Sequence, residues 1–118
     1  MRDIETLRGA VLSKRTGTVC KALRKLIDAR QFVLSDEEIA SLAARNEPVI
    51  HGWLFAYKVT QLPRPDLVVI LREGASSTEA RVREQVCDLA GDLEIVELLP
   101  ELAGLREDPI SFVAQAAE

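Results

Sequence analysis

The sequence contains few of the residue types that build reactive sites. Its 118 residues include one histidine, His51, and two cysteines, Cys20 and Cys87. A single histidine cannot form a multi-histidine metal site, and no Cys, Asp or Glu lies at ligand spacing from it. The two cysteines form no CxxC pair, so they indicate neither a redox motif nor a disulfide framework. We therefore expect no metal, no cofactor and no catalytic site, and we predict that the protein is not an enzyme.

Long apolar runs are also missing. The longest extends from Leu67 to Leu71, which is far shorter than the roughly 20 residues that cross a bilayer as a helix. The charged segment Met1 to Glu5 is not followed by the apolar stretch of a secretory signal. These absences predict a soluble protein with no membrane partner, and the cytoplasm is its expected location.

The remaining composition is that of an ordinary folded domain. Apolar residues make up 47% of the chain and charged residues 29%, so extensive disorder is not expected. A chain of this length suits one domain with a modest hydrophobic core. We identify no internal repeat and no linker, and we predict a single domain over residues 1–118.

The net charge of −4 conceals an asymmetry along the chain. Residues 1–34 contain eight Lys and Arg against three Asp and Glu, whereas residues 35–118 contain seven against sixteen. The basic segment could therefore contact nucleic acid or an acidic protein surface. Alternatively, the two segments complement each other within the fold or across a dimer. We favour the alternative, because a phosphate backbone repels a chain that is acidic as a whole.

Helical periodicity dominates residues 1–60. Apolar residues recur at helical spacing in residues 4–12 and again in residues 19–27. Ser35 and Glu38 then have the spacing of a capping box, which predicts the start of a third helix.

Residues 47–60 are ambiguous. Their β-branched and aromatic side chains would suit a buried strand. A helix is favoured, because Asn46 can cap it and Pro48 can occupy its first turn, where a missing N–H costs little.

Residues 66–118 predict an acidic βαβ unit. The segment from Leu62 to Asp66 contains two prolines and ends the preceding helix. Leu67–Leu71 then has the composition of a strand buried on both faces, and Leu93–Leu98 that of a second strand after an intervening helix. The expected fold is therefore α+β or α/β, with about four to five helices and two strands. It comprises N-terminal helices, the βαβ unit and a C-terminal helix.

Two segments resemble parts of DNA-binding proteins. The run Thr16–Leu26, TGTVCKALRKL, resembles the recognition helix of GntR-type winged-helix repressors. The run Glu37–Leu54 resembles the two-helix pattern of small DNA-binding regulators. The first run lacks a well-spaced helix ahead of it, and the second lacks the usual glycine at its turn. A helix-turn-helix transcriptional regulator is therefore the alternative function, with its nucleic-acid contacts expected at Lys14, Arg15, Lys21, Arg24 and Lys25.

Protein binding is the function that the sequence favours. Trp53, Phe55 and Tyr57 are three of the five aromatic residues, and aromatic side chains often anchor interfaces. Together with His51 they form the predicted partner-binding segment. We expect a regulator that blocks another protein, such as an inhibitor, an anti-activator or an immunity-type factor acting on a transcription factor or a toxin. A homodimer is also expected, because a two-stranded sheet leaves its edges open.

Overall fold

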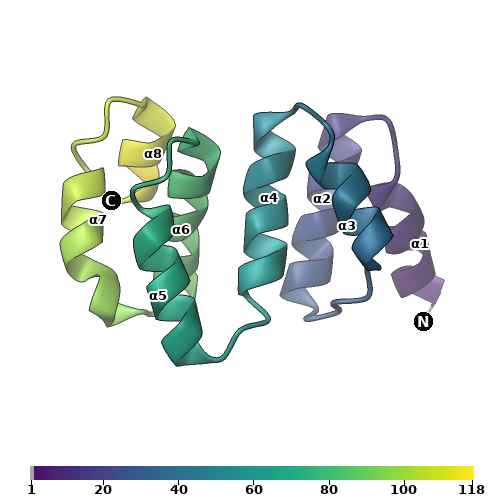
Figure 1. Ribbon diagram of the computed structural model, residues 1–118, viewed down its shortest axis with the longest axis horizontal. Coiled ribbons are helices and arrows are strands. Elements are labelled where there is room, and N and C mark those ends of the chain that lie inside the picture. The colour runs from purple at the N-terminus through teal and green to yellow at the C-terminus, as the bar shows by residue number, and fades with distance from the viewer. Residues whose placement is uncertain (1) are drawn as a thin grey trace. The chain divides into compact units, whose positions relative to one another are not determined.

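The computed structural model describes residues 2–118, and this part of the chain is helical (Figure 1). Eight α-helices and one short 3-10 helix make up the regular structure of the described residues, which include no strand. In chain order the elements are α1 (Arg2–Val11), α2 (Thr16–Asp28), α3 (Asp36–Ala43), α4 (Pro48–Val59), α5 (Arg64–Gly74), α6 (Ala80–Asp92), η1 (Val96–Leu98), α7 (Leu99–Leu105) and α8 (Ser111–Ala116). The predicted α+β or α/β fold is therefore wrong.

The first predicted strand, Leu67–Leu71, lies inside helix α5. Leu67 and Leu71 are buried one helical turn apart, whereas Val69 between them is 53% exposed. Pro65, which was expected only to end the preceding helix, lies in the first turn of α5, where its missing N–H breaks no helical hydrogen bond. An apolar run of this length fits a buried strand or a half-buried helix, and periodicity alone does not separate the two.

The second predicted strand, Leu93–Leu98, is the turn after α6 followed by η1. Ile95 and Leu98 are buried three residues apart, and Val96 between them is exposed. This is the spacing of a tight helical turn rather than the alternation of a strand. Neither strand of the βαβ unit exists in the described residues, so the open sheet edge that suggested a homodimer is absent there.

The helical predictions for residues 35–60 are confirmed. In the capping box of α3, the Ser35 hydroxyl accepts a hydrogen bond from the Glu38 amide at 3.1 Å, and the Glu38 carboxylate accepts one from the Ser35 amide at 2.8 Å. The ambiguous segment forms helix α4 with Pro48 in its first turn, although Glu47 rather than Asn46 is the N-cap.

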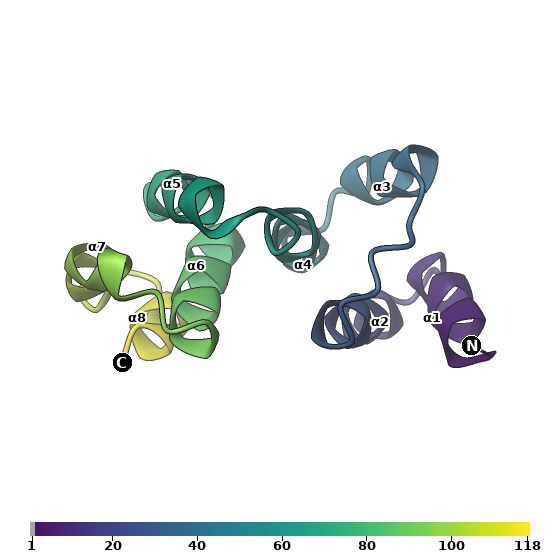
Figure 2. The same ribbon diagram turned by 90° about the horizontal axis from the view of Figure 1, so that it is seen from below.

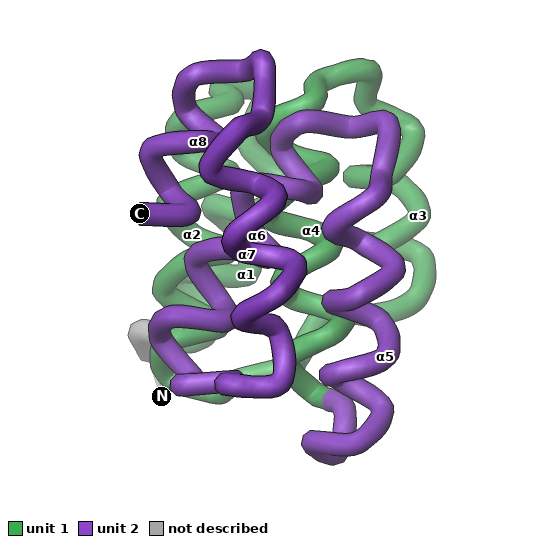
Figure 3. The backbone as a smooth tube through the Cα atoms, turned by 90° about the vertical axis from the view of Figure 1, so that its left-hand side faces the viewer, with its two compact units in different colours: residues 1–61 green, residues 62–118 purple. Residues whose placement is uncertain are grey.

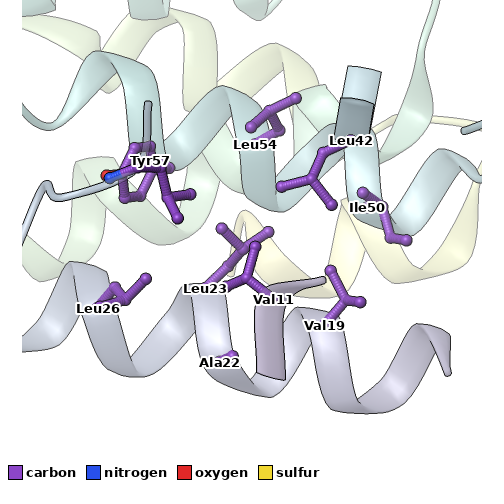
Figure 4. Packing of buried hydrophobic residues seen from close by; sticks show 10 residues of the cluster. Val11, Val19, Ala22, Leu23, Leu26, Leu42, Ile50, Leu54 and Tyr57 are labelled. Atoms are coloured by element: carbon purple, nitrogen blue, oxygen red, sulfur yellow. The ribbon is translucent and has the colours of Figure 1, made fainter. Parts of the chain in front are cut away.

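The chain divides into two compact units, residues 1–61 and 62–118 (Figure 3). In the first unit, α2 packs against α1 and α4, and α3 packs against α4. The chain thus forms two successive helical hairpins, seen end-on in Figure 2. Side chains from all four helices and from the turn after α2 meet in one core (Figure 4). This core comprises Val11, Val19, Ala22, Leu23, Leu26, Leu34, Leu42, Ile50, Leu54 and Tyr57.

The second unit is built around α6. This helix packs against α5, α7 and α8, and η1 contacts α5 and α7. Its buried apolar side chains come from every helix of the unit and from the turn after α6. They are Leu67, Leu71, Val82, Val86, Cys87, Leu89, Ala90, Ile95, Leu98, Leu105, Val113 and Ala117.

The two units resemble each other in their helices. Their first three helices have 10, 13 and 8 residues in the first unit and 11, 13 and 7 in the second. The fourth helix differs, with 12 residues in α4 and 6 in α8. Successive helical hairpins of this kind are the building blocks of α-solenoid proteins. The two units are therefore similar in the order and length of their first three helices, although α3 packs against α4 in the first unit whereas α7 packs against α6 and η1 in the second.

The longest helix of each unit ends in the same way. Arg30 after α2 and Glu94 after α6 are the two non-glycine residues with positive φ among those described, at 53° and 52°. In the residue that follows each of them, the Gln31 amide donates a hydrogen bond to the Leu26 carbonyl at 2.9 Å, and the Ile95 amide donates one to the Ala90 carbonyl, also at 2.9 Å. Both ends are Schellman motifs, in which a left-handed residue satisfies the last helical carbonyls. They place the turns after α2 and α6 at equivalent positions.

Candidate protein-binding surface

The two most exposed large apolar side chains of the described residues lie in η1 and at the start of α7. Val96 is 64% exposed and Leu99 is 59% exposed, and Leu93, at the end of α6, is 37% exposed. We call these three residues the 93–99 patch. Val96 and Leu99 border a hollow of about 260 Å³, whose lining also includes Ala90, Gly91, Glu94, Ile95 and Leu102.

Local structure explains why this turn presents apolar side chains to solvent. The left-handed residue Glu94 reverses the chain after α6. The next turn buries Ile95 and Leu98, which are 2% and 0% exposed. Because η1 has about three residues per turn, Val96 and Leu99 follow the two buried residues on a different face and point outward.

Two arginines of α5 hold the turn in place. Arg64 forms an ion pair with Glu97 at 2.9 Å, and Arg72 forms one with Glu101 at 3.0 Å. Arg72 also donates to the backbone carbonyl of Glu97 at 2.9 Å. A hydrogen bond from the Glu97 backbone amide, followed by the Arg64 guanidinium, lowers the pKa of the Glu97 carboxyl. The patch is therefore attached to a braced segment of the second unit.

The hollow carries one carboxylate. Glu94 is the only ionisable residue in its lining, and Asp92, also exposed, lies two residues before it in the chain. The Arg64 guanidinium approaches the Glu94 backbone carbonyl at 3.4 Å, but its charge is paired with Glu97. The surface around the 93–99 patch therefore combines apolar contact area with negative charge.

The residues predicted to bind a partner from α4 do not form one exposed surface. Tyr57 is 1% exposed, and this burial raises the pKa of its hydroxyl. Trp53 is half-buried against the core of the first unit, and Phe55 is half-buried. The ring of His51, also half-buried, has Nε2 2.5 Å from the Arg45 carbonyl oxygen. In this segment Tyr57 belongs to the core, while the other three expose only part of their surface.

All five residues predicted to contact nucleic acid are exposed. Lys14 and Arg15 lie in the loop before α2. On α2, Nε of Arg24 lies 3.9 Å from Oδ2 of Asp28. Lys21 and Lys25 border a groove of about 220 Å³ between α1 and α2, whose floor includes Leu7, Ala10 and Ala22. The apolar side of α2 is buried in the core, so the helix presents its basic side to solvent.

The cysteines and carboxylates show no reactive arrangement in the described chain. Cys87 is buried, and burial raises the pKa of its thiol to about 11. Cys20 is half-buried beside the first core. Within residues 2–118, no group of three His, Cys, Asp or Glu side chains could hold a metal ion.

Comparison with protein-family models, curated proteins and solved structures gives no match for this chain. Among the helices that the structure describes, none is both long and apolar enough to span a bilayer. The surfaces of the two units are therefore the features from which a function can be inferred.

The 93–99 patch was not predicted from the sequence, because Leu93–Leu98 was assigned to a buried strand. A usable signal was nevertheless present. Ile95 and Leu98 have helical spacing, so they can share one buried face. Val96 and Leu99 are equally apolar but lie one residue further along, which leaves them outside that face.

Proposed function

We propose that this protein is a non-catalytic, cytoplasmic regulator that acts by binding another protein. One observation carries the proposal: the 93–99 patch gathers three of the seven exposed large apolar residues of the described chain into seven consecutive positions. Apolar side chains grouped around a hollow and bordered by polar residues are typical of protein-binding sites. An inhibitor or anti-activator that masks its target needs only such a surface.

The helical architecture supports the same function. Helical hairpins commonly serve as scaffolds that display binding surfaces. The patch lies on a segment whose backbone is anchored by buried Ile95 and Leu98 and by the Arg72 hydrogen bond to the Glu97 carbonyl, so this backbone is ordered before a partner arrives. Such preorganisation reduces the entropy lost on binding.

Affinity capture from native cytosol, with and without nuclease, tests the proposal. The wild-type chain should retain a protein whose recovery is insensitive to nuclease. Val96→Asp should lose it, because the charge cannot be desolvated in an apolar contact. Val69→Asp is a matched control, since Val69 is an exposed valine of the same unit outside the patch. Equal recovery with Val96→Asp and wild type would overturn the proposal.

A second candidate is DNA binding through the first unit. It is favoured by the exposure of Lys14, Arg15, Lys21, Arg24 and Lys25, which lie in and before α2. Electrophoretic mobility shift with nonspecific duplex DNA tests it, because phosphate contacts are strongest at low salt. A shift at about 50 mM salt that Lys21→Glu with Lys25→Glu abolishes would support this function. The absence of any shift at that salt concentration would exclude it.

A further inference from the structure

In the first unit, the turn equivalent to the patch is covered by α4. The hydroxyl of Tyr57, on α4, accepts a hydrogen bond from the buried Leu34 amide at 2.9 Å. The Tyr57 ring meets the Phe32 ring edge-on, with centroids 5.4 Å apart. Phe32 and Leu34 both belong to the turn after α2. The second half of α4 therefore supplies an aromatic side chain that closes this turn.

A cation completes the cover of the first turn. The Arg30 guanidinium lies 5.6 Å from the centroid of the Phe32 ring. It also donates to the Thr60 carbonyl, which follows α4, at 3.3 Å. Arg30 is the left-handed residue of the Schellman motif, so the end of α2 is connected directly to the end of α4.

The equivalent turn of the second unit has no aromatic cover in the described chain; η1 packs against α5 and α7, which bury Leu98 but leave Val96 exposed. Counting from the two left-handed residues, Val96 corresponds to Phe32 and Leu98 to Leu34. The Leu98 amide donates to the Ile95 carbonyl at 3.1 Å within the 3-10 turn. Helix α8 is half as long as α4, and its one aromatic residue, Phe112, instead lies against the Arg81 guanidinium at 3.9 Å.

We propose that the hollow beside the 93–99 patch receives an α-helix of the partner protein, one that carries basic side chains and inserts a large apolar or aromatic residue against Val96 and Leu99. This inference rests on the proposed function and specifies its partner. In the second unit, the partner helix would cover Val96, the counterpart of Phe32, which Tyr57 of α4 contacts in the first unit. A groove that accepts one amphipathic helix is a common mode of peptide recognition.

Size and charge both define this occupant. The hollow, about 260 Å³, lies just below the small end of the roughly 300–1,000 Å³ range of ligand sites, and it has room for one anchoring side chain. Exposed Glu94 lies in its lining and exposed Asp92 two residues earlier in the chain, whereas Arg64 and Arg72 of α5 are paired with Glu97 and Glu101. The unpaired charge around the hollow is therefore negative. Electrostatic complementarity then selects a partner helix with Lys or Arg beside its anchor.

Two synthetic helical peptides test the inference on the full-length protein. Both carry the same apolar stripe with one central tryptophan, and their polar positions are all Lys in one peptide and all Glu in the other. Fluorescence anisotropy of the labelled peptides measures binding. We expect the Lys peptide to bind at least about tenfold more tightly than the Glu peptide.

Three variants locate the binding site. Val96→Asp should weaken the Lys peptide by at least about tenfold, because it removes an anchor contact. Glu94→Lys should weaken the Lys peptide and strengthen the Glu peptide. Val69→Asp should change neither affinity. Far-UV circular dichroism of each variant should show the helical content of the wild type, so that a loss of affinity reports on the surface.

The outcomes separate the inference from the proposed function. No binding of either peptide up to about 1 mM, equal affinity for both, or Lys-peptide binding unaffected by Val96→Asp overturns the inference. In each case, cytosolic capture that depends on Val96 leaves the proposed function standing. Conversely, Val96-dependent binding of the Lys peptide supports the inference as a property of the surface. Failure to capture any protein then counts only against the proposed function.

Discussion

The turns after α2 and α6 begin alike and end differently. Each follows a Schellman motif with a non-glycine residue in the left-handed conformation, Arg30 in one unit and Glu94 in the other. In the first unit, a tyrosine from a distant helix closes the turn. In the second, the turn closes its own hydrogen bonds as a 3-10 helix and leaves Val96 and Leu99 exposed. The same local motif thus precedes a turn closed by an aromatic side chain in one unit and, in the other, a turn that buries Ile95 and Leu98 but exposes Val96 and Leu99.

This difference identifies where the molecule can bind without unfolding. Removing a cover from the first turn exposes core residues and destabilises the unit. Adding a cover to the second turn buries side chains that are already exposed, which favours association. Five predictions follow from this contrast and from the ion pair that supports the second unit, from the largest expected effect to the smallest.

Removing the Tyr57 side chain from the turn after α2 should have the largest effect on the free energy of unfolding. Tyr57→Ala removes a large side chain that is 1% exposed and leaves the Leu34 amide without its acceptor. We expect the free energy of unfolding to fall by about 4 kcal/mol, as for other buried aromatic residues. Urea denaturation followed by circular dichroism measures the change. Phe112→Ala, at a half-buried aromatic of the second unit, should cost clearly less. A loss below about 1 kcal/mol for Tyr57→Ala would contradict the role of α4 as a cover.

The second unit depends on an ion pair away from its open turn. Arg83 on α6 binds both carboxylate oxygens of Asp108 at 2.8 and 3.1 Å, and it also donates to the Ser77 carbonyl at 2.8 Å. Hydrogen bonds from Arg83 lower the pKa of the Asp108 carboxyl. Asp108→Asn should therefore cost about 2 kcal/mol near neutral pH.

The same ion pair predicts an acid dependence. Because the folded pKa of Asp108 is lowered, its stabilising contribution is complete above the unfolded pKa of about 3.9 and is lost as pH falls through the folded value. Unfolding free energies measured at several pH values should fall less steeply with acid in Asp108→Asn than in wild type. Glu107→Gln, at the exposed neighbour, should follow the wild-type curve. Identical curves for wild type and Asp108→Asn would rule out this contribution.

Removing only the Tyr57 hydroxyl should lower the free energy of unfolding by a smaller amount. Tyr57→Phe keeps the ring contact with Phe32 but leaves the buried Leu34 amide unpaired. We expect a loss of about 1–2 kcal/mol. Hydrogen exchange of the Leu34 amide should accelerate, and exchange at the Leu98 amide, which is bonded within its own turn, should not change. Unchanged exchange at Leu34 would show that the tyrosine hydroxyl does not protect it.

The smallest effect concerns the two left-handed residues. Glycine adopts this conformation without the steric penalty of a Cβ atom. Glu94→Gly should therefore raise the free energy of unfolding by about 0.5–1 kcal/mol. Arg30→Gly should gain less or nothing, because it also loses the contacts of Arg30 with Phe32 and with the Thr60 carbonyl. Thermal unfolding compares the pair, and an equal gain at both sites would contradict the role of Arg30 in the cover.

Local signals in the sequence were sufficient for some elements. The spacing of Ser35 and Glu38 predicts the capping box that begins α3, and both of its hydrogen bonds are present. Pro48 predicts the first turn of α4 for the same kind of reason, because a proline is compatible with few helical positions other than the first. These predictions succeed because each depends on residues within one or two turns of each other.

The second half of the chain shows where local signals fail. Leu67–Leu71 is apolar enough for a buried strand, and only its packing against α6 makes it a helix with one exposed side. Likewise, the three aromatic residues of α4 look alike in the sequence, but packing buries Tyr57 and leaves Trp53 and Phe55 half-exposed. The candidate surface was missed for this reason: exposure is a property of neighbours that are distant in the chain.

The sequence by itself determined the low content of reactive residues, the charge asymmetry and the helical periodicity of the first unit, because these follow from residue type and local spacing. Only the tertiary structure decided that the second unit is also helical. It also decided that an aromatic side chain covers the turn after α2, whereas Val96 and Leu99 after α6 remain exposed. The physical reason is that a Schellman motif is specified locally, whereas its cover is a helix more than twenty residues away. The binding surface proposed for Val96 and Leu99 is a consequence of that long-range difference.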